Sequence, residues 1–269
     1  MAEAQLAWPW REVLITGASS GLGRALALAC AGAPGATLHL SGRDEARLAE
    51  TAAACEAAGA RVLPRAVDVR DAAAMARWIG GAGRLDLVVA NAGISAGTGG
   101  RAEPPEISRA VFETNVNGVL NTALPALEAM AQQSPGPDGV RGRIAVVASI
   151  AAFVAAPGAP AYCASKAAVQ RWAEALDATE RAARGVRLHA VCPGYVRTPM
   201  TARNRFPMPM LMEADRAALL TLRGIARGRV RIAYPLPLYL AARAVGGLPP
   251  ALLAALFTRL PAKAADPMP

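Results

Sequence analysis

The fold of this chain is decided by the stretch Val13-Leu14-Ile15-Thr16-Gly17-Ala18-Ser19-Ser20-Gly21-Leu22-Gly23. Three apolar residues, a glycine-rich turn and an Ala/Leu-rich segment that runs through Cys30 predict a strand, a tight turn and a helix in that order. Glycines let a backbone turn sharply and approach a pyrophosphate, whose charge is attracted by the N–H groups that begin the helix. The stretch therefore predicts dinucleotide contacts from Gly17, Ser19, Ser20, Gly21, Leu22 and Gly23.

The same alternation of strand and helix continues along the chain. Further apolar runs occupy residues 37–40, 61–67, 85–90, 143–148 and 186–191, and helical segments such as 44–58 separate them. This pattern predicts an α/β fold with a Rossmann-type, doubly wound parallel sheet that binds ligands at the carboxyl ends of its strands. The length of 269 residues fits a single domain. We expect residues 11–200 to form the cofactor-binding and catalytic core, and 201–269 to form a substrate lid and an apolar C-terminal extension.

Three side chains have the chemistry needed for proton transfer. Ser149 follows a predicted strand, and Tyr162 and Lys166 lie four residues apart at the start of an Ala-rich helix, so one helix turn brings them together. A free tyrosine, with a pKa near 10, needs a neighbouring charge to shuttle protons at neutral pH, and Lys166 can supply it. We predict that Ser149 hydrogen-bonds a carbonyl oxygen and that Tyr162 protonates it during reduction by a nicotinamide.

These motifs occur together in a characteristic order. Thr16-Gly17-x3-Gly21-x-Gly23, Asn91-Ala92-Gly93, Asn115, Ser149 and Tyr162-x3-Lys166 follow one another along the chain. In this order and at this spacing, residues 12–200 resemble the classical short-chain dehydrogenase/reductase family. The resemblance implies an oxidoreductase that moves a hydride between a nicotinamide and a carbonyl or alcohol carbon.

The resemblance also implies roles for further residues. Asn91, Ala92 and Gly93 would line the cofactor, Asp68 and Val69 would meet its adenine, and Pro193, Gly194, Val196 and Thr198 would lie on the nicotinamide side, with Tyr162 and Lys166 also in contact. Asn115 would complete a catalytic tetrad with Ser149, Tyr162 and Lys166 by holding a proton-relay water. Family members commonly assemble through their long helices, which implies a homodimer or homotetramer.

The residue after the second predicted strand bears on cofactor choice. An acidic residue there would accept a hydrogen bond from a free ribose 2′-hydroxyl, whereas a basic residue would pair with a 2′-phosphate. This chain has Gly42 and then Arg43, and a guanidinium can bind a phosphate through two parallel hydrogen bonds. Arg43 therefore predicts NADP (NADPH) rather than NAD. The alternative is an ordinary surface arginine at the start of a helix.

Charge and cysteine usage argue against a nucleic-acid partner and against metal or redox sites. The net charge of +9 comes from scattered arginines, with lysine only at positions 166 and 263, so we expect no nucleic-acid partner. The four cysteines, Cys30, Cys55, Cys163 and Cys192, lack the close spacing of metal or redox sites and are expected to be buried. No metal site is predicted, and His39 and His189 lie inside predicted strands. A cytoplasmic location is expected because residues 1–10 do not resemble a signal peptide.

Two segments after residue 199 are rich in apolar residues. Residues 200–212 combine four methionines with prolines and suggest a substrate lid for lipophilic ligands, although such clusters also serve as simple packing. Residues 234–260 are too interrupted by Gly and Pro to span a bilayer. They could cap the cleft, pair with another subunit, or lie on a membrane with Arg243 and Arg259 toward the headgroups.

Taken together, the sequence predicts an NADPH-dependent reductase of ketones or aldehydes with a lipophilic carbonyl substrate. One alternative is an NAD(P)-dependent alcohol dehydrogenase that works in the oxidative direction. Another is a non-catalytic, cofactor-binding regulator, against which the complete set of Ser149, Tyr162 and Lys166 argues.

Overall fold

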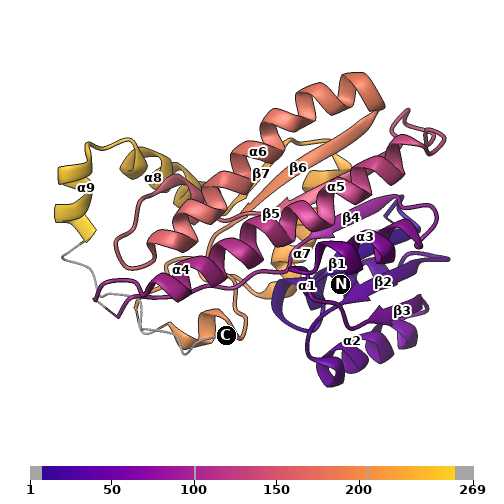
Figure 1. The fold of residues 1–269 in the computed structure, drawn as a ribbon, viewed down its shortest axis with the longest axis horizontal. Coiled ribbons are helices and arrows are strands. Elements are labelled where there is room, and N and C mark those ends of the chain that lie inside the picture. The colour runs from indigo at the N-terminus through magenta and orange to yellow at the C-terminus, as the bar shows by residue number, and fades with distance from the viewer. Residues whose placement is uncertain (1–7, 100, 205, 258–269) are drawn as a thin grey trace, which may run out of the picture.

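A single parallel sheet organises the molecule (Figure 1). The computed structural model describes residues 8–99, 101–204 and 206–257. The strands are β1 (Glu12–Thr16), β2 (Thr37–Ser41), β3 (Arg61–Arg65), β4 (Leu87–Ala90), β5 (Gly142–Val147), β6 (Val186–Pro193) and β7 (Arg231–Tyr234). Their order is β3-β2-β1-β4-β5-β6-β7, which confirms the doubly wound Rossmann-type sheet. The order reverses between β1 and β4, and the crevice at such a reversal is where ligands bind in these folds.

Helices cover both faces of the sheet. They are α1 (Gly21–Ala31), α2 (Glu45–Ala57), α3 (Ala72–Gly80), α4 (Pro105–Phe112), α5 (Gly118–Ala131), α6 (Pro160–Arg184), α7 (Ala214–Ala226), α8 (Leu236–Gly246) and α9 (Pro250–Phe257). Short turns are η1 (Glu113–Asn117), η2 (Ile150–Phe153) and η3 (Thr201–Arg203). Buried residues of α1, α2 and α7 pack on one face of the sheet, and those of α3, α5 and α6 pack on the other.

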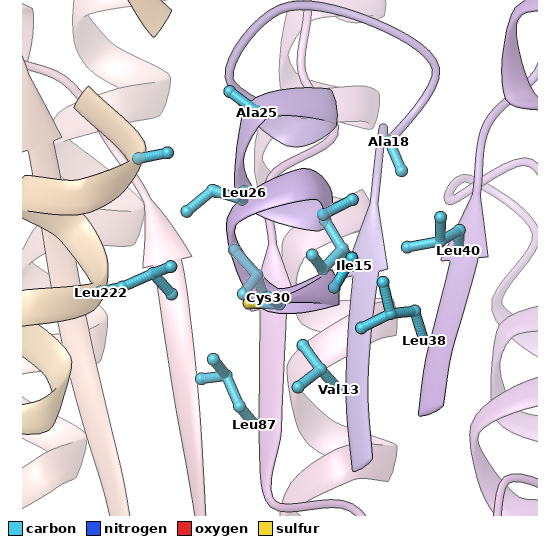
Figure 2. Close-up of a cluster of buried hydrophobic side chains, with 14 of the residues drawn as sticks. Val13, Ile15, Ala18, Ala25, Leu26, Cys30, Leu38, Leu40, Leu87 and Leu222 are labelled. Atoms are coloured by element: carbon cyan, nitrogen blue, oxygen red, sulfur yellow. The ribbon is translucent and has the colours of Figure 1, made fainter. Parts of the chain in front are cut away.

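Strand β1 shows why these residues form a central strand. Val13 and Ile15 point toward α1 and meet Leu26 in the cluster drawn in Figure 2, whereas Leu14 belongs to the cluster on the opposite face. Residues two apart in sequence share one face of a strand. Val13, Leu14 and Ile15 are all 0% exposed. Burying such a side chain contributes about 1.5–3 kcal/mol, so an unbroken apolar run is favoured where both faces are covered.

The sequence missed the seventh strand. β7 is only four residues long and begins with Arg231, so it lacks the long apolar run that marked the six predicted strands. Among the described residues it pairs only with β6, from Ala190↔Arg231 to Pro193↔Tyr234, and forms one edge of the sheet. An edge strand is covered by fewer neighbours and tolerates polar residues, which explains the weak signal.

Several predicted boundaries also change. The third strand ends at Arg65 rather than residue 67, β4 begins at Leu87 rather than 85, and β6 continues to Pro193. Asp44 precedes α2 as its N-cap and accepts the backbone N–H of Arg47. Such a cap satisfies an N–H group that has no partner inside the helix.

The C-terminal extension forms two short helices. α8 packs against η2, and α9 continues away from the sheet (Figure 1). Within the described residues, no helix combines the length and the apolar character required to cross a membrane. The predicted end of this segment, including Arg259, lies outside the described residues.

Candidate active site

The turn after β1 has glycine at positions where a side chain would not fit. Gly17 and Gly21 have φ values of +66° and +54°, in the left-handed region that favours glycine. A Cβ on Gly17 would lie 2.8 Å from Ala92 Cα, and one on Gly23 would lie 2.2 Å from Gly17 O. The backbone of the turn is therefore packed directly against the end of β4, and the start of α1 remains open to the cavity.

Asn91 joins the two strand ends. Its Nδ2 donates to Thr16 O at 2.9 Å and to Gly17 O at 3.2 Å. In return, Thr16 Oγ1 accepts the backbone N–H groups of Asn91 and Ala92, both at 3.1 Å. This reciprocal set of hydrogen bonds holds the switch point between β1 and β4 in one conformation.

A cavity of about 680 Å³ opens at the carboxyl ends of the strands. Its wall contains every cofactor-contact residue expected from the sequence: Gly17, Ser19, Ser20, Gly21, Leu22, Gly23, Arg43, Asp68, Val69, Asn91, Ala92, Gly93, Tyr162, Lys166, Pro193, Gly194, Val196 and Thr198. Ser149 lines it as well, whereas Asn115 does not. Segments from β1, β2, β4, β5, α6 and β6 thus meet at one site, as the parallel sheet predicts.

The end of the cavity next to β2 carries basic and hydroxyl groups. Arg43 is exposed and lines the wall, and within the described part of the chain it forms no ion pair. The hydroxyl of Ser41 is buried beside it without a hydrogen-bond partner. A buried polar group without a partner is costly, so this corner is suited to a polar ligand group.

Two ion pairs flank Arg43. Arg47 Nε lies 2.6 Å from Asp44 Oδ2, and Arg70 Nη2 lies 2.6 Å from Asp68 Oδ2. The hydrogen bond from Arg70 is the main cause that lowers the pKa of Asp68, and Arg43 contributes a smaller effect. Asp68 is therefore an anion whose charge is already neutralised in part by arginines.

The candidate catalytic residues come from β5 and α6. Ser149 follows β5 and caps η2, where its Oγ accepts the N–H of Ala151 at 3.1 Å. Tyr162 and Lys166 lie on the first turns of α6, and the Lys166 Nζ is 5.9 Å from the centroid of the Tyr162 ring. Tyr162 also forms a hydrogen bond with Ser149. The predicted trio is thus brought together on one side of the cavity.

Burial shifts the two titratable groups of this trio in opposite directions. It raises the pKa of Tyr162 to about 12, against which the hydrogen bond with Ser149 acts. It lowers the pKa of Lys166 to about 8, because an ammonium loses hydration inside the protein. Lys166 Nζ donates to Val147 O at 2.8 Å. At neutral pH, Tyr162 is a neutral phenol beside a cationic lysine.

Asn115 lies behind the cavity wall, in the π-helical turn η1, which joins α4 to α5 without a break. Its side chain is fully buried, with Oδ1 accepting Ile94 N at 2.8 Å and Nδ2 donating to Ile94 O at 2.9 Å and Ser165 Oγ at 3.1 Å. π-helical turns occur mostly as single-turn bulges inside α-helices and are frequent at functional sites. Asn115 ties α6 to the turn after β4, and its relay role stays a prediction.

An aromatic and ionic cluster supports the segment after Ser149. The ring of Phe153 in η2 meets Tyr239 of α8 edge-on, with centroids 5.1 Å apart, and the Arg231 guanidinium lies 5.4 Å from the same ring. Arg231 in turn pairs with Glu174 of α6 through two nitrogens and donates to Tyr239 Oη at 2.9 Å. The cluster links the catalytic helix, η2, β7 and the C-terminal extension.

Comparison with known proteins agrees with this geometry. The family model for short chain dehydrogenases matches residues 11–207. This chain belongs to the short-chain dehydrogenase/reductase family. It is 38% identical to an uncharacterized oxidoreductase of Myxococcus xanthus, over 93% of this chain and 98% of that one. It is 36% identical to the Streptomyces virginiae protein named "Monensin polyketide synthase putative ketoacyl reductase", over 78% of this chain and 80% of that one. The chain is thus an oxidoreductase of a family that uses NAD(P).

Solved structures of the family share the fold. A short-chain dehydrogenase/reductase from Burkholderia phymatum, crystallised with NAD, superposes with a TM-score of 0.79 at 27% identity, covering 98% of this chain and 99% of that one. A relative from Mycobacterium marinum gives a TM-score of 0.72 at 28% identity, covering 83% and 93%. The similarity to the Burkholderia structure extends over almost the whole of both chains.

Sequence reasoning missed some residues of the cavity wall. Arg47, Ile94 and Thr114 also line it, whereas Met200, which lines it as well, belongs to the segment expected to form a substrate lid. Arg47 lies one helix turn after Arg43, and that spacing could have indicated it. Ile94 and Thr114 carry no such signal, because their position depends on how α4 and η1 pack.

The remaining expectations concern groups outside the cavity. All four cysteines are buried, as predicted. His39 lies in β2 beside Glu12, and His189 lies in β6, where burial lowers its pKa to about 4. Across residues 8–99, 101–204 and 206–257, no group of three or more His, Cys, Asp or Glu side chains could hold a metal ion.

Proposed function

We propose that this protein is an NADPH-dependent carbonyl reductase that acts on lipophilic ketones or aldehydes through Ser149, Tyr162 and Lys166. The observation that carries the proposal is the convergence of these three side chains on one wall of the nucleotide-sized cavity. The non-catalytic regulator is disfavoured, since such a protein has no need of a buried lysine beside a half-buried tyrosine that lines the cavity.

The cavity fits a dinucleotide. The positions of Gly17 and Gly23 leave no room for a Cβ, which favours close backbone approach to a pyrophosphate at the start of α1. The Arg43 guanidinium and the Ser41 hydroxyl, which have no ion-pair or hydrogen-bond partner among the described residues, suit the 2′-phosphate of NADPH. When bound, the nicotinamide would supply the hydride.

The proton chemistry belongs to the protein. Ser149 would hydrogen-bond the carbonyl oxygen of the substrate, and Tyr162 would transfer its phenolic proton to that oxygen as negative charge develops there. The raised pKa of Tyr162 keeps it protonated at neutral pH, as a proton donor requires. The Lys166 cation would stabilise the phenolate left after transfer, because a positive charge nearby favours the anionic form.

The reductive direction has specific support. A neutral Tyr162 is the proton-donor form, whereas oxidation of an alcohol needs a proton acceptor at the same position. The similarity to a protein named as a ketoacyl reductase points the same way. Alcohol oxidation with NAD(P) is the second candidate, because the same residues would carry the proton in the reverse direction.

The proposal is tested by measuring NADPH oxidation with a series of ketones and aldehydes of increasing chain length and ring content. Tyr162→Phe should lower turnover by about 10²–10⁴-fold, since only the proton donor is lost. Its affinity for NADPH should stay within about twofold, because the ring remains in place. Tyr234→Phe is a matched control, since Tyr234 is a buried tyrosine that bonds Thr221 and does not line the cavity. Substantial turnover by Tyr162→Phe would refute the role of Tyr162.

A further inference from the structure

The C-terminal helices expose an unusual amount of apolar surface. Ten large hydrophobic side chains are exposed among the described residues, and five of them belong to α8, α9 and the turn between them. These five are Leu236, Leu240, Leu248, Leu252 and Leu256, with exposed fractions from 39% to 61%. We call them the C-terminal apolar surface. Single exposed leucines are common on soluble proteins, but half of the exposed large hydrophobic side chains of the described residues belong to this one segment, and large apolar patches mark interaction surfaces.

The shape of α9 distinguishes between possible partners. Leu252 and Leu256 are exposed, and so are Pro250, Ala251, Ala254 and Ala255, whereas Leu253 is buried. At 100° per residue, these exposed positions cover about two-thirds of the circumference of the helix. A protein surface covers one face of a helix and would leave the other apolar positions in water. A helix immersed in the boundary between headgroups and acyl chains would have most of them in contact with lipid.

Length and charge agree with a lipid surface. An eight-residue helix is about 12 Å long, far short of the ~30 Å hydrocarbon core, so α9 would lie at the membrane interface. Arg243 is exposed on α8 and is the sole charged residue from position 236 to 257. The protein as a whole carries a net charge of +9, which anionic headgroups would attract.

We propose that α8 and α9 dock this protein on an anionic lipid bilayer. The leucines of the C-terminal apolar surface enter the boundary between headgroups and acyl chains, and Arg243 pairs with headgroup phosphates. The docking itself is independent of the enzymatic activity proposed above.

Docking would also place the cavity near the membrane. Gly194 lines the cavity, and a Cβ built on it would lie 3.0 Å from both Pro235 and Leu238 at the start of α8. The docked helix therefore adjoins the wall that Gly194 forms. A lipophilic carbonyl compound dissolved in the bilayer would have a short path to the site, a consequence that rests on the proposed function.

The test is co-flotation of the full chain with lipid vesicles, without cofactor or substrate. One set of vesicles contains phosphatidylcholine and phosphatidylglycerol at 3:1, and the other contains phosphatidylcholine alone. We expect wild type to bind the anionic vesicles at least ten times more tightly than the neutral ones at low salt. Leu252→Glu should weaken this binding about tenfold or more, because a carboxylate must remain hydrated.

Matched variants separate docking from general effects. Leu63→Glu places the same charge at an exposed leucine of β3, the sheet edge farthest from β7, and should bind as wild type does. Arg243→Glu keeps the apolar surface and should weaken binding to the anionic vesicles. Melting curves by circular dichroism show whether each variant is folded.

Three results would overturn the proposal. In the first, wild type floats with neither type of vesicle. In the second, Leu252→Glu and Arg243→Glu both bind the anionic vesicles as tightly as wild type does. In the third, light scattering shows that Leu252→Glu converts a dimer to a monomer. The last result would assign the surface to a second copy of the chain. None of these measurements uses turnover, so failure of the docking proposal would leave the proposed reductase activity unaffected.

Discussion

Arg43 is the side chain on which the proposed preference for NADPH depends. A hydrogen bond to a charged group contributes about 1.5–3 kcal/mol, which corresponds to about 10- to 150-fold in affinity. Wild type should therefore prefer NADPH over NADH by at least tenfold in kcat/KM, and Arg43→Gln should remove most of this preference. Both cofactors are compared at one fixed salt concentration, because screening weakens charge discrimination.

The neighbouring arginine provides the control for this prediction. Arg47 also lines the cavity, but its guanidinium is paired with Asp44, so Arg47→Gln should change the preference by about threefold or less. Introducing an acid at Gly42 is less simple than the sequence suggests, because its Cβ would lie 3.0 Å from Ser19 Cβ and Oγ. A wild type that uses NADH and NADPH equally would make Arg43 an ordinary surface residue.

Lys166 should impose a pH dependence on reduction. Burial lowers its pKa to about 8, so the lysine is cationic below that pH and loses its charge as the pH rises through it. The value of kcat/KM with NADPH should accordingly fall by about tenfold per pH unit above pH 8. Tyr162, with a pKa of about 12, and His189, with a pKa of about 4, do not titrate between pH 6 and 10. A flat profile over that range would contradict this role for Lys166.

The contact between α8 and η2 should control the position of the catalytic serine segment. A Cβ on Gly246 would lie 1.7 Å from Phe153 O, so the helix approaches this backbone as closely as only glycine permits. Gly246→Ala must move α8 or η2, at a cost of about 1–3 kcal/mol. We expect a lower midpoint of urea denaturation and a lower kcat.

The adjacent glycine tests whether the effect comes from this contact. A Cβ on Gly247 would lie 3.5 Å from Ala244 O, an ordinary contact distance, and its φ of −83° suits alanine. Gly247→Ala should therefore leave the denaturation midpoint and kcat nearly unchanged. Equal effects of the two substitutions would indicate that the helix end, rather than the contact with Phe153, determines both properties.

A second apolar surface, on α4 and α5, predicts that the protein forms an oligomer. Phe112 and Leu124 are 41% and 46% exposed, and the half-buried Val116 and Leu120 lie between them at intervals of four residues. A stripe of this kind can pair with its own copy across a two-fold axis. Light scattering should give two or four times the mass of 27.6 kDa, and Leu124→Glu should reduce it. Leu63→Glu is again the control, and a monomeric wild type at micromolar concentration would contradict the prediction.

The sequence by itself determined the features whose causes are local. The turn from Gly17 to Gly23 follows from backbone freedom, the pairing of Tyr162 with Lys166 follows from one helix turn, and β1 follows from an unbroken apolar run. Each of these depends on residues only a few positions apart. The glycine-rich end of the cavity and the Tyr162–Lys166 pair could therefore be predicted before the structure was known, and Ser149 was indicated by its position at the end of a predicted strand.

Only the tertiary structure decided what depends on neighbours distant in the chain. The edge strand β7 exists because β6 offers it a partner, and Asn115 points to Ile94 and Ser165 because α4, η1 and α6 pack together. The leucines of α8 and α9 have the composition of core residues, yet nothing in their sequence says which of them stay exposed. Burial is a property of the packed assembly of elements, and the hydrophobic effect acts on whichever surface that packing leaves in contact with water.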